Sequence, residues 1–88
     1  MKLDFVGPAS LLGNGDVSYP AILDGKHLRC SFSYEALQDL DPDGVKTDAL
    51  QSFKNHQLKL LSLAEQKILN GHAIDGAVHL FSHDLILD

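Results

Sequence analysis

The chain has a single cysteine, Cys30, and no tryptophan among its 88 residues. One cysteine cannot form a disulfide within the chain, which suits a reducing compartment such as the cytoplasm. No apolar run approaches the roughly 20 residues of a membrane span. Asp4 and Gly7-Pro8 interrupt the start of the chain, where a signal peptide keeps its apolar stretch. The sequence therefore predicts a cytoplasmic protein without a membrane segment.

Positive charge is also scarce. Seven lysines and arginines stand against twelve acidic residues, so the formal net charge is −5. The basic residues are scattered along the chain, and an acidic balance of this kind repels phosphate. We therefore expect no nucleic-acid partner, and the charge disfavours a nucleic-acid-binding regulator.

The composition is that of one compact domain. Apolar residues make up 44 % of the chain and charged residues 22 %, as in soluble globular proteins. A length of 88 residues fits one domain with one core. The sequence thus predicts a single domain over residues 1–88.

The best-defined unit is a β-hairpin over about residues 16–33. Asp24-Gly25 separates two runs in which apolar and polar residues alternate, "DVSYPAIL" and "KHLRCSFS". Asp-Gly is typical of a two-residue type I′ turn, because both positions need positive φ. Such a turn sets the register and predicts one consistently apolar face. The pairs on this face are Val17 with Phe32, Tyr19 with Cys30 and Ala21 with Leu28.

Two helices are predicted after the hairpin. Ser33 can cap a short helix over about 34–40, and "DPDG" follows it as a turn whose Asp side chains bond their own backbone. Thr47 can cap a long helix over about 48–70, which Gly71 ends in the left-handed conformation. Residues at spacings of three and four form a stripe that faces the core. The stripe comprises Leu50, Phe53, Leu60, Leu61, Ala64 and Ile68, with Gln57 as a polar member.

Short strands are predicted near both ends. Apolar and polar residues alternate over residues 3–5, and again over about 77–81 after an Asp75-Gly76 turn. Residues 82–88 fit either a strand or a helix. Together the elements predict an α+β fold, a small antiparallel sheet of three or four strands with the two helices packed on one face.

Cys30 is the candidate nucleophile, since His27 and Arg29 lie close to it in the sequence. Side chains alternate along a strand, so those of His27 and Arg29 point away from the thiol. Its predicted neighbours are apolar, and burial among them raises a thiol pKa and makes the group unreactive. The sequence therefore predicts a buried thiol and no catalytic residue.

The histidines and carboxylates offer two further kinds of site. His79 and His83 can share a metal ion only if the tail is helical, because four residues of strand span roughly 13 Å. Asp84 is then the obvious third ligand. A calcium loop beginning at Asp39 or Asp41 lacks the glutamate that such a loop needs at its last position. We expect no metal and no cofactor.

The face of the sheet away from the helices is the remaining candidate. The alternation predicts that Ile22, His27, His79 and Phe81 lie on it, which makes the face partly apolar. We expect this face to be the interface of a non-catalytic protein-interaction or regulatory module, whose partner is a second copy of the chain or another protein. The alternatives are a transcriptional regulator and a small metal-dependent or histidine-using enzyme, with Asp75 or Asp84 assisting.

One stretch of the chain also resembles a known family. "VSYPAILDGKHLRCSFSYEALQDL" is similar to the opening signature of the domain of unknown function 1488 family, which has an aromatic residue and alanine, a turn ending in glycine, then Cys, Ser and an Ala-Leu helix. The resemblance extends from about Val17 to Leu80. It departs at His56-Gln57, where the family tends to have a polar residue followed by arginine. It implies an α+β fold in a small cytoplasmic bacterial protein without established activity, some members having been labelled regulators.

Overall fold

The computed structural model describes residues 2–81, and its centre is the predicted hairpin. Strands β3 (Val17–Leu23) and β4 (Lys26–Phe32) pair antiparallel, with Val17 opposite Phe32 and Leu23 opposite Lys26. Asp24 and Gly25 have φ angles of 51° and 83°, as a type I′ turn requires. The predicted register is confirmed along the whole hairpin.

Three shorter strands complete a five-stranded sheet. Strands β1 (Leu3–Phe5) and β2 (Ser10–Leu11) both pair antiparallel with β3, and β5 (Ala77–Leu80) lies beside β4. The pairing of β4 with β5 is parallel. The predicted α+β fold is confirmed, but the sheet is mixed instead of purely antiparallel, and β2 adds a strand beyond the four in the order β1-β3-β4-β5. The helices form a crossover between β4 and β5, and a crossover connection makes the two strands parallel.

Four helices are present among the described residues where two were predicted. They are α1 (Tyr34–Leu40), α2 (Pro42–Thr47), α3 (Ala49–Asn55) and α4 (Gln57–Leu69). The predicted Asp-Pro-Asp-Gly turn is the start of α2, because Asp41 caps the helix and Pro42 occupies its first turn. The predicted helix over 48–70 breaks at His56, and its cap is Asp48 instead of Thr47.

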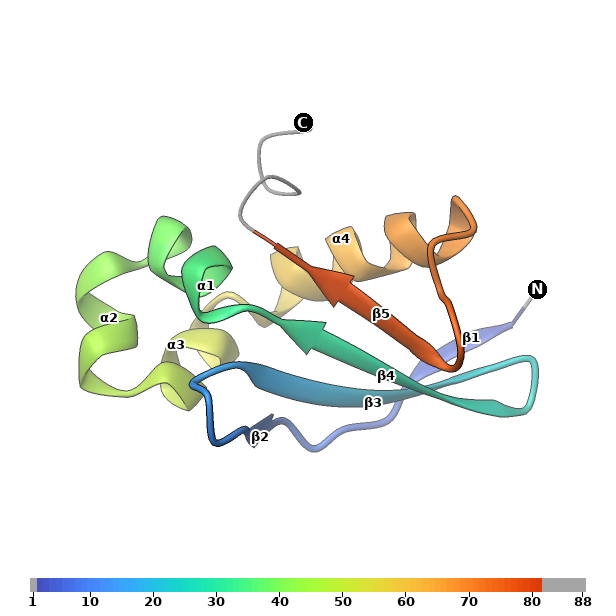
Figure 1. The fold of residues 1–88 in the computed structure, drawn as a ribbon, viewed down its shortest axis with the longest axis horizontal. Helices are drawn as coiled ribbons and strands as arrows, with labels where there is room; N and C mark the ends of the chain where they lie inside the picture. The colour runs from blue at the N-terminus through green and yellow to red at the C-terminus, as the bar shows by residue number, and fades with distance from the viewer. Residues whose placement is uncertain (1, 82–88) are drawn as a thin grey trace.

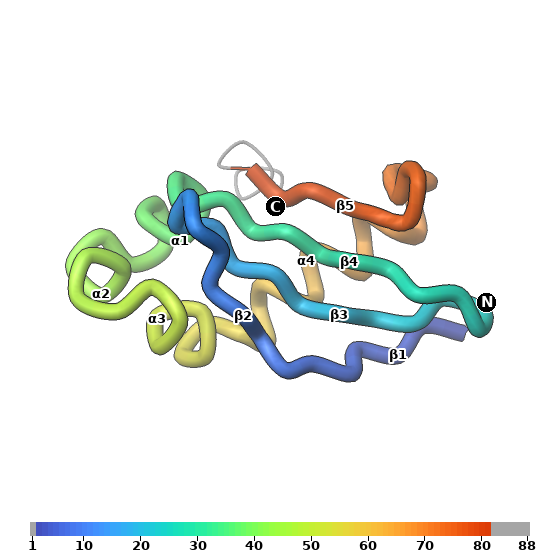
Figure 2. Tube along the Cα trace, turned by 60° about the horizontal axis from the view of Figure 1, so that its bottom comes forward, coloured from blue at the N-terminus to red at the C-terminus, as the bar shows by residue number. Residues whose placement is uncertain are grey.

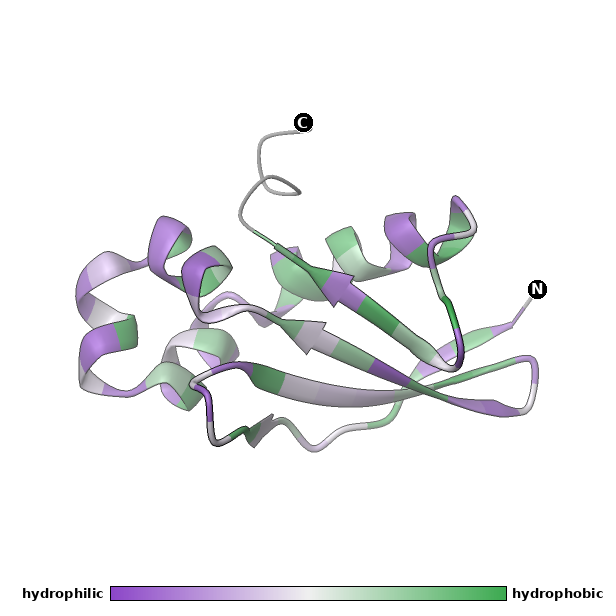
Figure 3. Cartoon of the chain, viewed as in Figure 1, coloured by the Kyte–Doolittle hydropathy of each residue, from purple (hydrophilic) through white to green (hydrophobic). Residues whose placement is uncertain are grey.

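The helices cover one face of the sheet. Figures 1 and 2 show α4 behind the strands, while α1, α2 and α3 gather at one end of the sheet. The apolar side chains of β3, β4 and β5 meet these helices, and Val17, Cys30, Phe32, Phe53 and Val78 are fully buried there. Burial alternates along β5, where Val78 and Leu80 are buried and His79 is exposed, and Figure 3 shows a hydrophilic stretch of this strand between hydrophobic ones. None of the helices over residues 2–81 is long and apolar enough to cross a membrane.

Several local predictions are confirmed. The Ser33 hydroxyl accepts a hydrogen bond from the Ala36 N–H at 3.1 Å and so caps α1. Gly71 follows α4 with a φ of 83°, and Asp75 and Gly76 turn the chain into β5 with φ angles of 53° and 76°. His83 and Asp84, which were considered with His79 as metal ligands if the tail is helical, lie outside the described residues.

Candidate functional site

The side of the sheet opposite the helices, here called the exposed sheet face, carries a mixed set of side chains. Arg29 lies at its centre, between Pro20 on β3 and Ala77 on β5. Ile22 and His27 are direct partners across the hairpin. The exposed sheet face consists of Asp4, Ser18, Pro20, Ile22, His27, Arg29, Ser31, Ala77, His79 and Phe81.

The structure brings the four predicted interface residues together only as two pairs. Ile22 and His27 lie near the hairpin turn, whereas His79 is in register with Ser31 at the other end of β4. The rings of His79 and Phe81 are stacked, with centroids 6.1 Å apart and planes 16° apart. The alternation places Arg29 on the same side of the hairpin as His27, but the predicted interface did not include it. Along β4, Arg29 lies between the positions of the two pairs.

Phe81 is held at the margin of the exposed sheet face. It keeps 46 % of its surface exposed. Lys67, on α4, places its Nζ atom 5.5 Å from the centroid of the Phe81 ring and donates a hydrogen bond to the backbone oxygen of His79. A cation over an aromatic ring is attracted to it. These contacts fix one apolar group of the face at the outer edge of β5.

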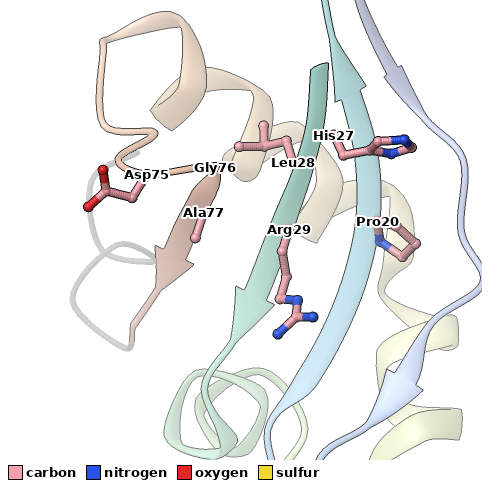
Figure 4. Close-up of a pocket in the computed structure, with 7 residues that line it drawn as sticks. All are labelled: Pro20, His27, Leu28, Arg29, Asp75, Gly76 and Ala77. Atoms are coloured by element: carbon pink, nitrogen blue, oxygen red, sulfur yellow. The ribbon is translucent and has the colours of Figure 1, made fainter. Parts of the chain in front are cut away.

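A shallow depression of about 410 Å³ lies beside Arg29. Pro20, His27, Leu28, Asp75, Gly76 and Ala77 complete its lining. Figure 4 shows the His27 ring and the Arg29 guanidinium over the strands, while the Asp75 carboxylate points away from them. His27 and Asp75 are therefore not arranged as a catalytic pair.

Both edges of the sheet have features that hinder pairing with a further strand. At the β5 edge the backbone N–H and C=O of Ala77 bond to Ile74, and the His79 oxygen bonds to Lys67. At the other edge β1 and β2 are two short pieces, separated where the N–H groups of Val6 and Gly7 both donate to the Pro20 oxygen. Short, interrupted edges are a known means of preventing edge-to-edge association.

A second polar cluster lies at the helix junctions. One Asp41 oxygen, Oδ2, is 3.6 Å from His56 Nε2 and accepts a hydrogen bond from the buried Ser52 hydroxyl at 3.4 Å. The other, Oδ1, accepts one from the Gly44 N–H at 3.1 Å. In a nucleophilic triad the histidine lies between the hydroxyl and the carboxylate. Here the carboxylate lies between them, so the cluster joins the α1–α2 junction to the α3–α4 junction and activates no hydroxyl.

No group of three metal-ligating side chains occurs among residues 2–81. His79 lies on a strand, where its neighbours in sequence point away from it. Asp39 and Asp41, weighed as the start of a calcium loop, lie on α1 and at the cap of α2.

Comparison with known proteins shows the family of the chain. The family model described as "Protein of unknown function (DUF1488)" matches residues 13–80. The chain belongs to the DUF1488 family. The resemblance inferred from the hairpin signature is therefore confirmed. No curated protein matches the chain.

A crystal structure from the DUF1488 family has the same fold. It is of a protein of unknown function from Shewanella loihica PV-4, with a TM-score of 0.71 and 16 % sequence identity to this chain. The match covers 91 % of this chain and 94 % of that one. At this identity the likeness extends to the fold and not to individual side chains.

The thiol of this DUF1488 protein is in the core, as predicted. Cys30 has no exposed surface, and desolvation by burial raises the pKa of its thiol to about 11. Because the thiolate is the reactive form, at neutral pH the thiolate fraction of Cys30 is about 100-fold below that of an ordinary thiol. His27 and Arg29 lie on the opposite side of the sheet and do not lower this pKa.

Alkylation of Cys30 should therefore be slow. At neutral pH we expect iodoacetamide to label the folded protein at least about 100-fold more slowly than the protein unfolded in guanidinium chloride. The rate should rise about tenfold per pH unit up to the pKa of about 11, as the thiolate forms. Mass spectrometry of quenched samples measures both rates. Equal rates for the folded and unfolded protein would show that the thiol is accessible and ionised as in solution.

Proposed function

We propose that this DUF1488 protein is a non-catalytic protein-interaction module, with a regulatory role exerted through its partner, and that the partner docks on the exposed sheet face. The observation that carries the proposal is that helices cover only one of the two faces of the sheet. Helices cover one face, and the other presents Phe81, Ile22 and Pro20 around the single arginine of the chain.

The composition of the exposed sheet face supports docking of a protein. The buried centres of protein interfaces are enriched in aromatic residues and arginine and depleted in lysine and carboxylates. Phe81 and Arg29 fit this composition, and the face has no lysine, while its carboxylate, Asp4, lies on the outer strand β1. The small side chains of Pro20 and Ala77, which line the shallow depression, also let a partner approach closely there.

The obstacles to strand addition at both edges favour a partner that docks on the exposed sheet face. Addition of a strand to β5 would have to displace the bonds of Ala77 with Ile74 and of Lys67 with the His79 oxygen. Addition to the other edge would meet the break between β1 and β2. A partner that covers the face meets neither obstacle. The proposed occupant is a second copy of the chain or another protein, and twofold pairing is the commonest form of self-association.

The non-catalytic part of the proposal rests on the polar groups of the described residues. Cys30 is buried with a raised pKa, and the Asp41 carboxylate separates Ser52 from His56. The depression beside Arg29 is shallow, and its carboxylate points outward. None of these arrangements supplies an activated nucleophile next to a base.

Site-specific photo-crosslinking tests this proposal. A photoreactive phenylalanine analogue at His27, in the cells that make the protein, should form an adduct of one defined mass, because the docked partner covers that side chain. The same analogue at Leu58 is the matched control, since Leu58 is an apolar residue on α4 with 89 % of its surface exposed.

The adduct should be absent, or at least about tenfold weaker, at the control position. A mass of twice the chain identifies a second copy, and any other mass identifies another protein. Adducts of equal yield at both positions, or none at His27, would contradict docking on the exposed sheet face.

A further inference from the structure

We infer that the exposed sheet face recognises an acidic segment of another protein, one in which carboxylates recur at alternate positions. This inference rests on the proposed function and adds the chemistry of the partner. It comes from the distribution of charge, because the one arginine of the chain lies on this face, while the chain as a whole is acidic.

Arg29 is the first observation. It is the only arginine of the chain, it is exposed, and among residues 2–81 no carboxylate forms an ion pair with it. The chain has twelve acidic residues, so the lack of a partner is not due to a shortage of carboxylates. Asp75, the acid nearest to it around the depression, points away (Figure 4). A guanidinium left open in this way has its bidentate donors available for an incoming carboxylate.

The second observation is the alignment of basic groups along β4. His27 and Arg29 are alternate residues of one strand, so their side chains leave the same face about 7 Å apart. His79, on β5 in register with Ser31, lies two residues further along and one strand to the side. Alternate residues of an extended segment are also about 7 Å apart, so successive carboxylates of such a segment can reach successive groups of the row.

The third observation is the acidic remainder of the molecule. The helical end exposes Glu35, Asp39, Asp43 and Asp48. On the exposed side of the sheet, the acidic residue Asp4 lies on β1, in register with Ile22. Strand β3 separates Asp4 from Arg29 on β4. A net charge of −5 repels an acidic partner from the molecule as a whole, so on the exposed sheet face the row of His27, Arg29 and His79 is the place that can attract it. The same net charge repels nucleic acid.

A pair of labelled peptides tests the inference. In one, glutamate alternates with valine and serine, and in the other glutamine replaces every glutamate. Fluorescence anisotropy at low and at physiological salt should give at least tenfold tighter binding of the glutamate peptide, with the difference shrinking as salt rises.

Two charge reversals assign the effect to the face. Arg29→Glu should weaken binding of the glutamate peptide about tenfold, and Arg29→Lys should weaken it less. Lys59→Glu is the matched control because it makes the same change in net charge on α4, and it should change the affinity by less than twofold. Equal losses in both reversals, or equal affinity for the two peptides, would overturn the inference.

The peptide result is separable from the crosslinking result. A face-specific adduct at His27 together with no preference for glutamate would leave the docking surface standing and remove the acidic partner. Light scattering of the protein alone adds one further outcome. Self-association that Arg29→Glu abolishes and Lys59→Glu does not would make the occupant a second copy and overturn the partner inferred here.

Discussion

Replacement of Phe53 by alanine should lower the free energy of unfolding by about 3–5 kcal/mol, the usual cost of deleting a buried aromatic ring. Phe53, on α3, is fully buried. Its ring centroid is 5.0 Å from that of Phe32 on β4 and 5.7 Å from that of Tyr19 on β3. The substitution removes the ring that joins α3 to both strands of the hairpin, and the backbone around it can collapse only in part.

The expected loss is large relative to the total free energy of unfolding of a small domain. Small domains have unfolding free energies of about 5–15 kcal/mol, so the variant should be folded only weakly. Urea denaturation followed by far-UV circular dichroism measures the change. Phe81→Ala is the matched control. Because Phe81 is half exposed, this substitution should lower the free energy of unfolding by less than about 1 kcal/mol. A loss below about 1 kcal/mol for Phe53→Ala would mean that α3 does not anchor the core.

The hairpin was predictable because its signals are local. Asp24-Gly25 fixes the turn, and a period of two then determines every partner from Leu23 with Lys26 to Val17 with Phe32. A slip by one residue would expose the whole apolar set, so the turn and the pattern must agree. The burial of Cys30 followed from the same alternation.

The direction of β5 was not predictable from its own residues. Alternation identifies a strand and its buried side but carries no information on which neighbour it takes or in which direction it runs. That direction depends on the path of the chain through α1 to α4, which is set by packing at the end of the sheet. The break at His56 was hidden for a related reason, because the apolar spacing continues from Phe53 to Leu60 across it.

The candidate site was predicted in part. The exposed side of the hairpin followed from alternation, but the position of Arg29 between two strands required the register of β5 on β4. The Asp41 cluster could not be predicted, since the contact of Asp41 with His56 exists only because the helices break at both residues. Asp-Pro-Asp-Gly suits a turn and a helix start equally well, because aspartate can bond the backbone in either and proline fits the first helical turn.

Asp41 should contribute more to stability than an ordinary surface carboxylate. Its oxygens accept hydrogen bonds from the Gly44 N–H and the Ser52 hydroxyl and lie close to His56. Asp41→Ala removes the cap of α2 and the connection between two helix junctions. We expect the free energy of unfolding to fall by about 1–2 kcal/mol in urea denaturation, from the cap and the lost hydrogen bonds together.

A second substitution, Gly44→Ala, tests whether the Asp41 carboxylate is held in its cap position. Alanine is normally favoured over glycine within a helix by about 1 kcal/mol. At Gly44, however, an added Cβ would overlap Asp41 Oδ2 and lie 2.6 Å from Asp41 Cγ, so the carboxylate must leave its cap position. Gly44→Ala should therefore destabilise the protein by about 1 kcal/mol when Asp41 is present. In the Asp41→Ala background the obstacle is gone, and the same substitution should stabilise by about 0.5–1 kcal/mol. Stabilisation by Gly44→Ala in both backgrounds would show that the Asp41 carboxylate is free to move aside without loss, and that it does not hold the helix junctions together.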